Sequence, residues 1–219
     1  MAILLRSSQA FVTAARAVAN FSANGNAPAQ SIADESASIV LFLEQLNMMA
    51  AAGGIAAIMA TDTRPLSLTY PRHVANAQVL GMLGAGQALT VSGVPVAGLA
   101  AIQADTRVKS FTVADGAGAI AGALDALNAA ARLTAITLTS GDRLTLSVTR
   151  LANDAAVLGK IVSPYTLTVT SVTVAALEQV RANPRVSAIQ IIDTAAAVAA
   201  AFPALNAMPS ISEIGRAHV

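Results

Sequence analysis

Three aspartates recur at one position of a repeated pattern, and they are the first candidates for chemistry. Asp34, Asp115 and Asp193 align when the segments SIADESASIVLFLEQLN, FTVADGAGAIAGALDALN and IQIIDTAAAVAAAFPALN are overlaid, at offsets of 81 and 78 residues. Each follows a strand-like run and precedes a helix-like run, so its carboxylate is placed to accept the first free amide hydrogens of that helix. A calcium ladder is the alternative, but Ca²⁺ takes about 6–8 oxygen ligands and three aspartates are too few. We expect capping, with no metal and no cofactor.

The same overlay aligns three asparagines at the ends of the helix-like runs. Asn47, Asn128 and Asn206 stand where each long helix is predicted to stop. Asparagine tolerates the left-handed backbone conformation that ends many helices. We therefore predict that these residues terminate helices in that conformation.

The run DGAGAIA, from Asp115 to Ala121, imitates a dinucleotide-binding turn. It places Gly116 and Gly118 between a strand-like run and a helix, and an acidic residue, Asp142, follows at a plausible distance. The same frame appears as DESASIV and DTAAAVA, with no glycine at either matching position. The repeat therefore forms without a phosphate cradle, and a nucleotide-binding enzyme domain stays an alternative.

One histidine could serve as an acid or base near neutral pH. His73 lies in TYPRHVAN, and the second histidine, His218, lies at the far carboxyl end. The chain has no Cys, so it has neither a thiolate nucleophile nor a disulfide, and it shows no GxSxG, HExxH, P-loop or EF-hand pattern. We expect His73 in a solvated loop or helix start, and no enzyme. Arg107 and Arg185 recur at equivalent turns, where their stems are predicted to cover apolar edges.

Composition narrows the range of partners. Hydrophobic residues make up 55% of the 219 positions and charged residues only 11%; there are 13 basic and 12 acidic side chains, and the basic ones are scattered singly. Nucleic-acid binding is not expected, because it needs a basic patch. The uncharged stretch Val74 to Ala104 is long enough to span a membrane, but glycines and Pro95 interrupt it. Membrane insertion is therefore the weaker alternative.

Internal repeats organise the chain. VLGMLGAGQALTVSGVPVAGLAAIQADTRV overlays VLGKIVSPYTLTVTSVTVAALEQVRANPRV at a constant offset of 78 residues, without a gap. Hydrophobic spacing alternates between periods of about 3.6 and 2 within each unit, which is typical of helices feeding strands. Four strands are predicted per circuit: Phe111–Val113, Ile136–Leu138, Leu167–Val169 and Ile189–Ile191. Ala-rich helices are predicted between them: Gly118–Ala131, Arg150–Ile161 and Val174–Ala182.

These coils predict an α/β solenoid with one continuous parallel sheet. The outward strand positions would then form a polar face that could contact a surface or a protein partner. They are Ser31, Met59, Thr90, Thr112, Thr137, Thr168 and Gln190, and the interaction surface is predicted at Thr90, Thr112, Thr137, Thr168 and Gln190. The predicted divisions are a partial coil at 1–30, repeat units at 31–109 and 110–187, and the start of a third unit at 188–212.

Two resemblances complete this interpretation. VRANPRVSAIQIID is similar to a leucine-rich repeat without its Asn signature. Over Ile32 to about Met208, with SPYTLTV and the D-T-A-A helix start as motifs, the chain resembles tandem repeats of large secreted or surface proteins of Gram-negative bacteria, of the adhesin and type I-secreted exoprotein kind. That resemblance implies an extracellular or cell-surface stalk or adhesive segment.

Both ends interrupt the pattern. FPALNAM is expected to stop where the next strand would follow, and residues 213–219, EIGRAHV, resemble a translated sequencing adapter. We expect these last residues to be non-native. Unprotected coil ends also predict end-to-end self-association that depends on concentration.

Overall fold

The computed structural model describes residues 10–23, 28–84 and 86–216, which divide into two compact units. Unit 1 comprises residues up to 94 together with 98–111, and unit 2 comprises residues 95–97 and those from 112 onward. The start of the chain, at 1–9, and His218 lie outside the described residues. We describe each unit by itself.

Unit 1 alternates parallel strands with short helices. Leu-, Ile- and Val-rich positions of its strands and helices form its core, for example Ile32, Leu46 and Leu89, which are fully buried. Its elements are α1 (Ala14–Ala23), β1 (Gln30–Asp34), α2 (Ser36–Leu41), α3 (Leu43–Ala51), β2 (Ile55–Ala60), β3 (Leu66–Thr69), α4 (Tyr70–Ala75), α5 (Ala77–Met82), β4 (Leu89–Val94), α6 (Leu99–Ala104) and the first half of β5 (Val108–Asp115).

Unit 2 repeats this order of elements. It begins with the 3₁₀ turn η1 (Val96–Gly98) and the second half of β5. Its other elements are α7 (Ala117–Gly122), α8 (Leu124–Asn128), β6 (Leu133–Leu138), β7 (Arg143–Ser147), α9 (Val148–Asn153), α10 (Ala155–Leu158), β8 (Thr166–Val172), η2 (Val174–Ala176), α11 (Leu177–Arg181), β9 (Val186–Asp193), α12 (Ala195–Asn206) and β10 (Ile211–Arg216).

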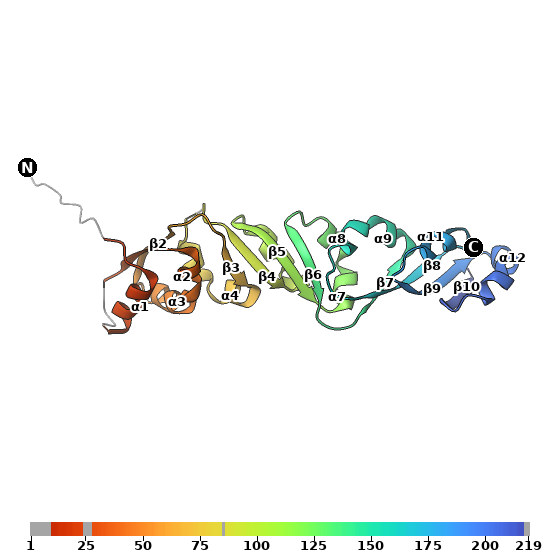
Figure 1. Cartoon of the computed structure of the whole chain (residues 1–219), viewed down its shortest axis with the longest axis horizontal. Coiled ribbons are helices and arrows are strands. Elements are labelled where there is room, and N and C mark those ends of the chain that lie inside the picture. Colours follow the sequence, from red (N-terminus) through yellow and green to blue (C-terminus); the bar gives the residue numbers. More distant parts are fainter. Residues whose placement is uncertain (1–9, 24–27, 85, 217–219) are drawn as a thin grey trace, which may run out of the picture. The chain divides into compact units, whose positions relative to one another are not determined.

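The strands form parallel sheets, as the repeat predicts, but the described strands are divided among three sheets. One contains β1 and β2, a second has the order β3-β4-β5-β6, and a third has the order β10-β9-β8-β7, which Figure 1 shows in unit 2. The expectation of one continuous sheet is wrong. Isolated parallel bridges place Leu83 beside Ile58 of β2 and Ile161 beside Ile136 of β6.

All four predicted strands are present, and a fifth was missed. The predicted segments lie inside β5, β6, β8 and β9. The missed strand is β7, in which Leu144 and Leu146 are buried and the residues between and around them are polar. It follows β6 after a turn that contains Gly141, at a φ of +72°. The hydrophobic spacing of the sequence does not predict β7, because the strand is short and runs directly into α9.

The predicted helices are present but divided. The run expected as one helix from Gly118 to Ala131 is broken at Ala123, between α7 and α8. The run from Arg150 is broken at Asp154, between α9 and α10. Ala123 and Asp154 are each the last flanking residue of one short helix and the first flanking residue of the next.

The stretch from Val74 to Ala104 is not one continuous helix. It is divided among the end of α4, α5, β4, η1 and α6. None of the described helices has the length and apolar character that crossing a bilayer requires.

A left-handed backbone conformation recurs at two equivalent positions. Gly93 in β4 has a φ of +70°, and Ser171, 78 positions later in β8, has a φ of +58°. The pairing of β8 with β9 shifts register there, between Val169 and Val172. The left-handed conformation is ordinary for glycine and strained for serine.

Candidate functional site

The three recurring aspartates link two elements each. One carboxylate oxygen of Asp34 accepts a hydrogen bond from the Glu35 amide at 2.9 Å, and the other accepts one from the Ala14 amide at 3.0 Å. Asp115 and Asp193 repeat this arrangement. Asp115 accepts from Gly116 and Val96, and Asp193 accepts from Thr194 and Val174, at distances of 2.7 to 2.9 Å.

The helix that receives each cap differs from the one that the sequence predicts. Ala14, Val96 and Val174 are the first residues of α1, η1 and η2, which lie about 19 to 20 residues before their aspartates. The carboxylates therefore cap the start of the preceding helix and join it to the end of the strand. Within the described residues, no group of three His, Cys, Asp or Glu side chains is arranged to hold a metal ion.

Asn128 and Asn206 are the last residues of α8 and α12, as predicted, but the predicted left-handed conformation is wrong. None of Asn47, Asn128 and Asn206 has a positive φ; Ser171 is the non-glycine residue that does among the described residues. Asn47 lies within α3, where its side chain donates to the Ala75 carbonyl at 3.2 Å and accepts from the Val79 amide at 3.1 Å. It therefore fastens α3 to the bend between α4 and α5.

An arginine joins neighbouring helices in both units. Arg72 of α4 donates to the Val40 carbonyl at 2.6 Å and forms an ion pair with Glu44. The hydrogen bond from Arg72 to the Glu44 carboxylate lowers the pKa of Glu44. In unit 2, Arg150 of α9 donates to the Ala121 carbonyl at 2.9 Å and pairs with Asp125. Arg72 and Arg150 share the 78-residue offset, which is the sequence signal that could have identified this pair of contacts.

A polar residue is buried at the bend behind each arginine. Asn76 donates from Nδ2 to the Arg72 carbonyl at 2.9 Å. Its equivalent in unit 2 is Asp154, which is only 1% exposed. The Oδ2 atom of Asp154 is buried without a hydrogen-bond partner in the described part of the chain. Burial raises the pKa of this carboxyl, the nearby charge of Asp125 raises it further, and Arg150 partly offsets both.

His73 has a carboxylate partner and is not solvated, although it does lie near a helix start, as one of the predicted alternatives has it. It lies in α4, largely buried, with Nε2 at 3.3 Å from Asp105 and with Nδ1 buried and unpartnered among the described residues. Arg107 donates to both oxygens of Asp105, at 3.0 and 2.9 Å, and lowers the pKa of Asp105 to about 2. This histidine–carboxylate–arginine cluster is the arrangement in the chain that most resembles catalytic machinery.

The repeat shows what the cluster does for the fold. Arg107 also donates to the Leu80 carbonyl near the end of α5. At the equivalent place in unit 2, the carbonyl of Leu158 accepts from the Tyr165 hydroxyl at 3.1 Å, and the Arg185 guanidinium stacks over that ring at 4.1 Å. The two arginines thus support the same helix end by different contacts.

The glycine turn at Asp115 to Ala121 is filled by the chain itself. The Gly116 amide donates to Asp115, and the Ala117 amide donates to the Ser140 carbonyl at 2.9 Å. A β-carbon on Gly116 would lie 2.8 Å from the Ser140 hydroxyl, a side-chain atom that could move aside, so the loop approaches this turn closely without requiring a glycine. Two amides that a phosphate would use are therefore already bonded.

The predicted interaction residues differ in exposure. Thr137 is exposed, and Thr90, Thr112 and Gln190 are half-buried. Thr168 is only 9% exposed, so the expectation that it lies on an open surface is wrong. It pairs with Thr145 of β7 on one side and Ala188 of β9 on the other, so neighbouring strands cover much of it.

Comparison with known proteins gives no family. No family model, curated protein or solved structure matches this chain. The candidate sites are therefore judged on their own geometry and on the differences between repeats.

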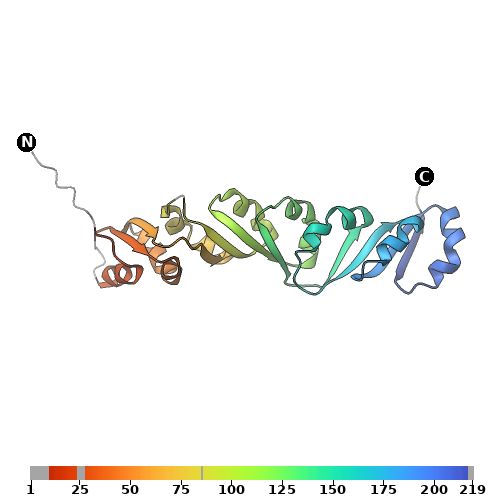
Figure 2. The ribbon, with the colours of Figure 1, turned by 45° about the horizontal axis from the view of Figure 1, so that its top comes forward.

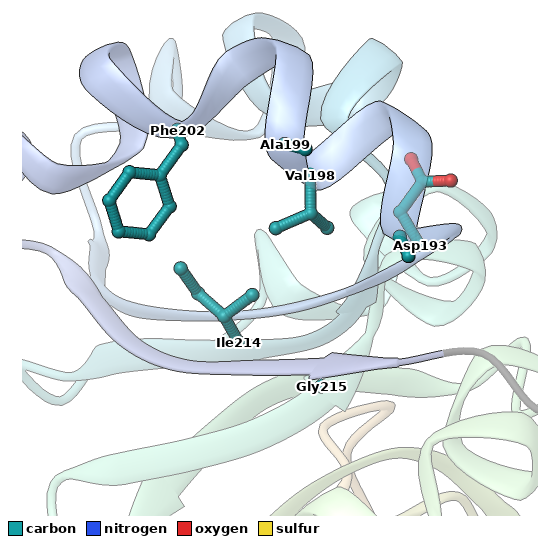
Figure 3. Close-up of a pocket in the computed structure, with 7 residues that line it drawn as sticks. Asp193, Val198, Ala199, Phe202, Ile214 and Gly215 are labelled. Atoms are coloured by element: carbon teal, nitrogen blue, oxygen red, sulfur yellow. The ribbon is translucent and has the colours of Figure 1, made fainter.

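A cavity of about 610 Å³ lies between α12 and β10. Val198 and Phe202 of α12 point across it toward Ile214 of β10, and Asp193 lies at one end (Figure 3). Its lining is largely apolar, and the one acidic side chain in it already accepts two backbone hydrogen bonds. This cavity offers contact area for an apolar partner and no catalytic group among the residues that line it.

Proposed function

We propose that the chain is a non-enzymatic structural and adhesive repeat segment of a large extracellular or cell-surface bacterial protein, built as coils of an α/β solenoid. One observation carries the structural part of this proposal. The aspartates that the sequence offers for chemistry recur three times with the same two backbone hydrogen bonds, each joining a strand end to the preceding helix. Stability in such an array is a sum over repeats and their contacts.

The differences between repeats also favour a structural role. His73 and Asp105, the strongest candidates for acid–base chemistry, correspond to Leu151 and Asn183 in unit 2. The Arg185 amide donates to Asn183 at 3.0 Å, as the Arg107 amide donates to Asp105 at 3.0 Å. The turn therefore forms with either residue, and the carboxylate is used by the fold.

The adhesive part of the proposal rests on the polar strand positions and on the resemblance to bacterial surface repeats. To test it, bacteria would display the chain, and their retention on an uncharged, hydroxylated agarose surface would be measured in a flow cell. A variant with Thr90→Lys, Thr137→Lys and Gln190→Lys is expected to lower retention by at least about tenfold, because many weak contacts act together on a displayed surface.

A matched control places the same charges on exposed helix positions. The variant with Gln45→Lys, Ala126→Lys and Gln179→Lys changes the net charge equally and is expected to keep its retention. Circular dichroism checks that both variants fold. Equal retention of both variants would contradict an adhesive role for the strand positions, and unfolding of the strand variant would contradict their assignment to a surface.

A further inference from the structure

The face of α12 that borders the cavity is an exposed apolar surface of unit 2 with a counterpart elsewhere in the chain. Phe202 is 55% exposed and Ile214, opposite it, is 41% exposed. Figure 2 shows α12 beside the strand β10, toward which Phe202 and Val198 point in Figure 3. We call Val198, Phe202 and Ile214 the α12 face; Ile214 belongs to the segment 213–219 that resembles a translated adapter, so Val198 and Phe202 carry the inference.

The residues equivalent to Val198 and Phe202 are fully buried in both earlier repeats. Ile120 and Leu124, which stand 78 positions before them, are 0% exposed, and so are Ile39 and Leu43 in unit 1. The helices themselves are alike in pattern, so their composition does not explain the difference. A segment that packs on the earlier helices explains it.

That covering segment has one pattern in both units. It is Leu66–Leu83 in unit 1 and Leu144–Ile161 in unit 2, and each consists of a short strand followed by two short helices. Both begin with two leucines two residues apart and carry an arginine four residues after the second leucine. The apolar positions coincide and are buried: Leu66, Leu68, Val79, Leu80 and Leu83 in one, and Leu144, Leu146, Val157, Leu158 and Ile161 in the other.

Three contacts hold the covering segment of unit 2 in place. The loop before it accepts a hydrogen bond from the Ala117 amide through the Ser140 carbonyl, Arg150 donates to the Ala121 carbonyl, and Ile161 bridges to Ile136 of β6. Unit 1 has the corresponding contacts, from Ser36 to Asp62 and Arg64, from Arg72 to Val40, and between Leu83 and Ile58.

The α12 face presents the matching set of partners. Ala195, Ala199 and Ile214 stand at the positions of Ala117, Ala121 and Ile136, and all three line the cavity. Pro203, inside α12, has no amide hydrogen, so the Ala199 carbonyl lacks its usual helical hydrogen bond. An incoming arginine would supply a donor for that carbonyl.

We propose that the α12 face binds a third covering segment. This segment is a strand with two leucines two residues apart, an arginine four residues after the second, and two short apolar helices. The proposal rests on the geometry of the two covered repeats and not on the adhesive role. The leucines would fill the cavity between α12 and β10, and the arginine would reach the Ala199 carbonyl.

The test uses a chain that carries a second copy of residues 139–162 directly after Arg216, in place of residues 217–219. A control chain carries Leu144→Asp and Leu146→Asp in the appended copy only. Hydrogen–deuterium exchange is measured at the backbone amides of α12. The appended segment is expected to slow exchange there by at least about tenfold, because a covered helix opens less often, and the control segment is not.

Two further measurements decide between the occupants. Phe202→Asp in the extended chain is expected to abolish the slowing, and circular dichroism confirms that this variant folds. Sedimentation of the unextended chain tests whether a second copy covers the face instead. No slowing in the extended chain, equal slowing in the control, or protection of α12 that rises only with the concentration of the unextended chain would each overturn the proposal. Adhesion does not enter these measurements, so the two proposals can fail independently.

Discussion

Replacing Asp154 with asparagine is expected to stabilise the protein at neutral pH. The equivalent residue in unit 1 is already an asparagine: Asn76 is buried at the same bend and donates to the Arg72 carbonyl at 2.9 Å. Asp154 has no such donor when ionised, and its Oδ2 atom is buried without a partner in the described structure. The side-chain amide that Asp154→Asn introduces would be able to donate to the Arg150 carbonyl, while Arg150 keeps its ion pair with Asp125.

The magnitude follows from the unsatisfied atom. A buried polar group without a hydrogen bond costs about 1–3 kcal/mol, so Asp154→Asn is expected to raise the free energy of unfolding at pH 7 by about that amount. The pH dependence has a definite sign. The pKa of Asp154 is raised from 3.8 in the folded state. Protonation of this carboxyl therefore stabilises the folded protein, and the free energy of unfolding falls as the pH rises from 3.8 through the folded pKa.

Urea denaturation of both proteins at pH 3.5 and pH 7 measures this effect. The stabilisation of Asp154→Asn is expected to be large at pH 7 and small at pH 3.5. Asn76→Asp is the matched control, and it is expected to destabilise unit 1 at pH 7 and less so at pH 3.5. An Asp154→Asn protein that is no more stable than the parent at pH 7, or a gain that does not change with pH, would refute the reasoning.

Three further substitutions test other parts of the structure by the same denaturation assay. Ser171→Gly is expected to stabilise by about 1 kcal/mol because it relieves a left-handed serine, and Gly93→Ala, where no atom crowds the new β-carbon, is expected to destabilise similarly. Asp115→Ala removes two backbone hydrogen bonds and is expected to cost about 1–3 kcal/mol, whereas Asp142→Ala on the exposed loop is expected to change little; equal effects would contradict the linking role. The pKa of Asp105 is lowered from 3.8 to about 2, so its stabilisation is present above pH 3.8 and is lost as the pH falls toward 2; Asp105→Asn is expected to remove that acid-dependent loss, and an unchanged acid profile would refute it.

Much of the architecture follows from spacing in the sequence. The 78-residue offset and the alternation of periods predict parallel strands joined by short helices, and β5, β6, β8 and β9 lie where those patterns predict them. Hydrophobic spacing does not report which strand lies beside which. The sheets divide between β2 and β3 and between β6 and β7, and the second of these connections contains Gly141, at a φ of +72°.

The aspartates show why a correct chemical role can be assigned to the wrong partner. Asp34, Asp115 and Asp193 do cap helices, as their types and positions predict. Local spacing favours the helix that follows each residue, yet the capped helix lies about 19 to 20 residues earlier and meets the aspartate only after the chain folds back. At the start of the following helix, each aspartate accepts a hydrogen bond from the N-cap amide.

The carboxyl-terminal strand corrects another expectation. A strand, β10, follows α12 and pairs with β9 in parallel, with Ile211 beside Ile189 and Ile214 beside Ile191. It includes residues 213–216 of the segment that resembles a translated adapter. Its apolar residues coincide with those of β6, since Ile214 stands 78 positions after Ile136. Two apolar residues three positions apart, beside the edge of a parallel sheet, are compatible with strand formation.

A comparison of equivalent positions in the two units shows which side chains the fold requires and which it does not. The end of α5 is supported by Arg107 and the end of α10 by Tyr165, so the fold requires a donor there and not a particular side chain. By the same comparison, the fold does not require a histidine at position 73, because Leu151 occupies the equivalent place. His73 nevertheless buries an imidazole nitrogen without a partner among the described residues. His73→Leu is therefore expected to leave the stability unchanged or to raise it, and a marked loss of stability would show that its contact with Asp105 is part of what holds unit 1 together.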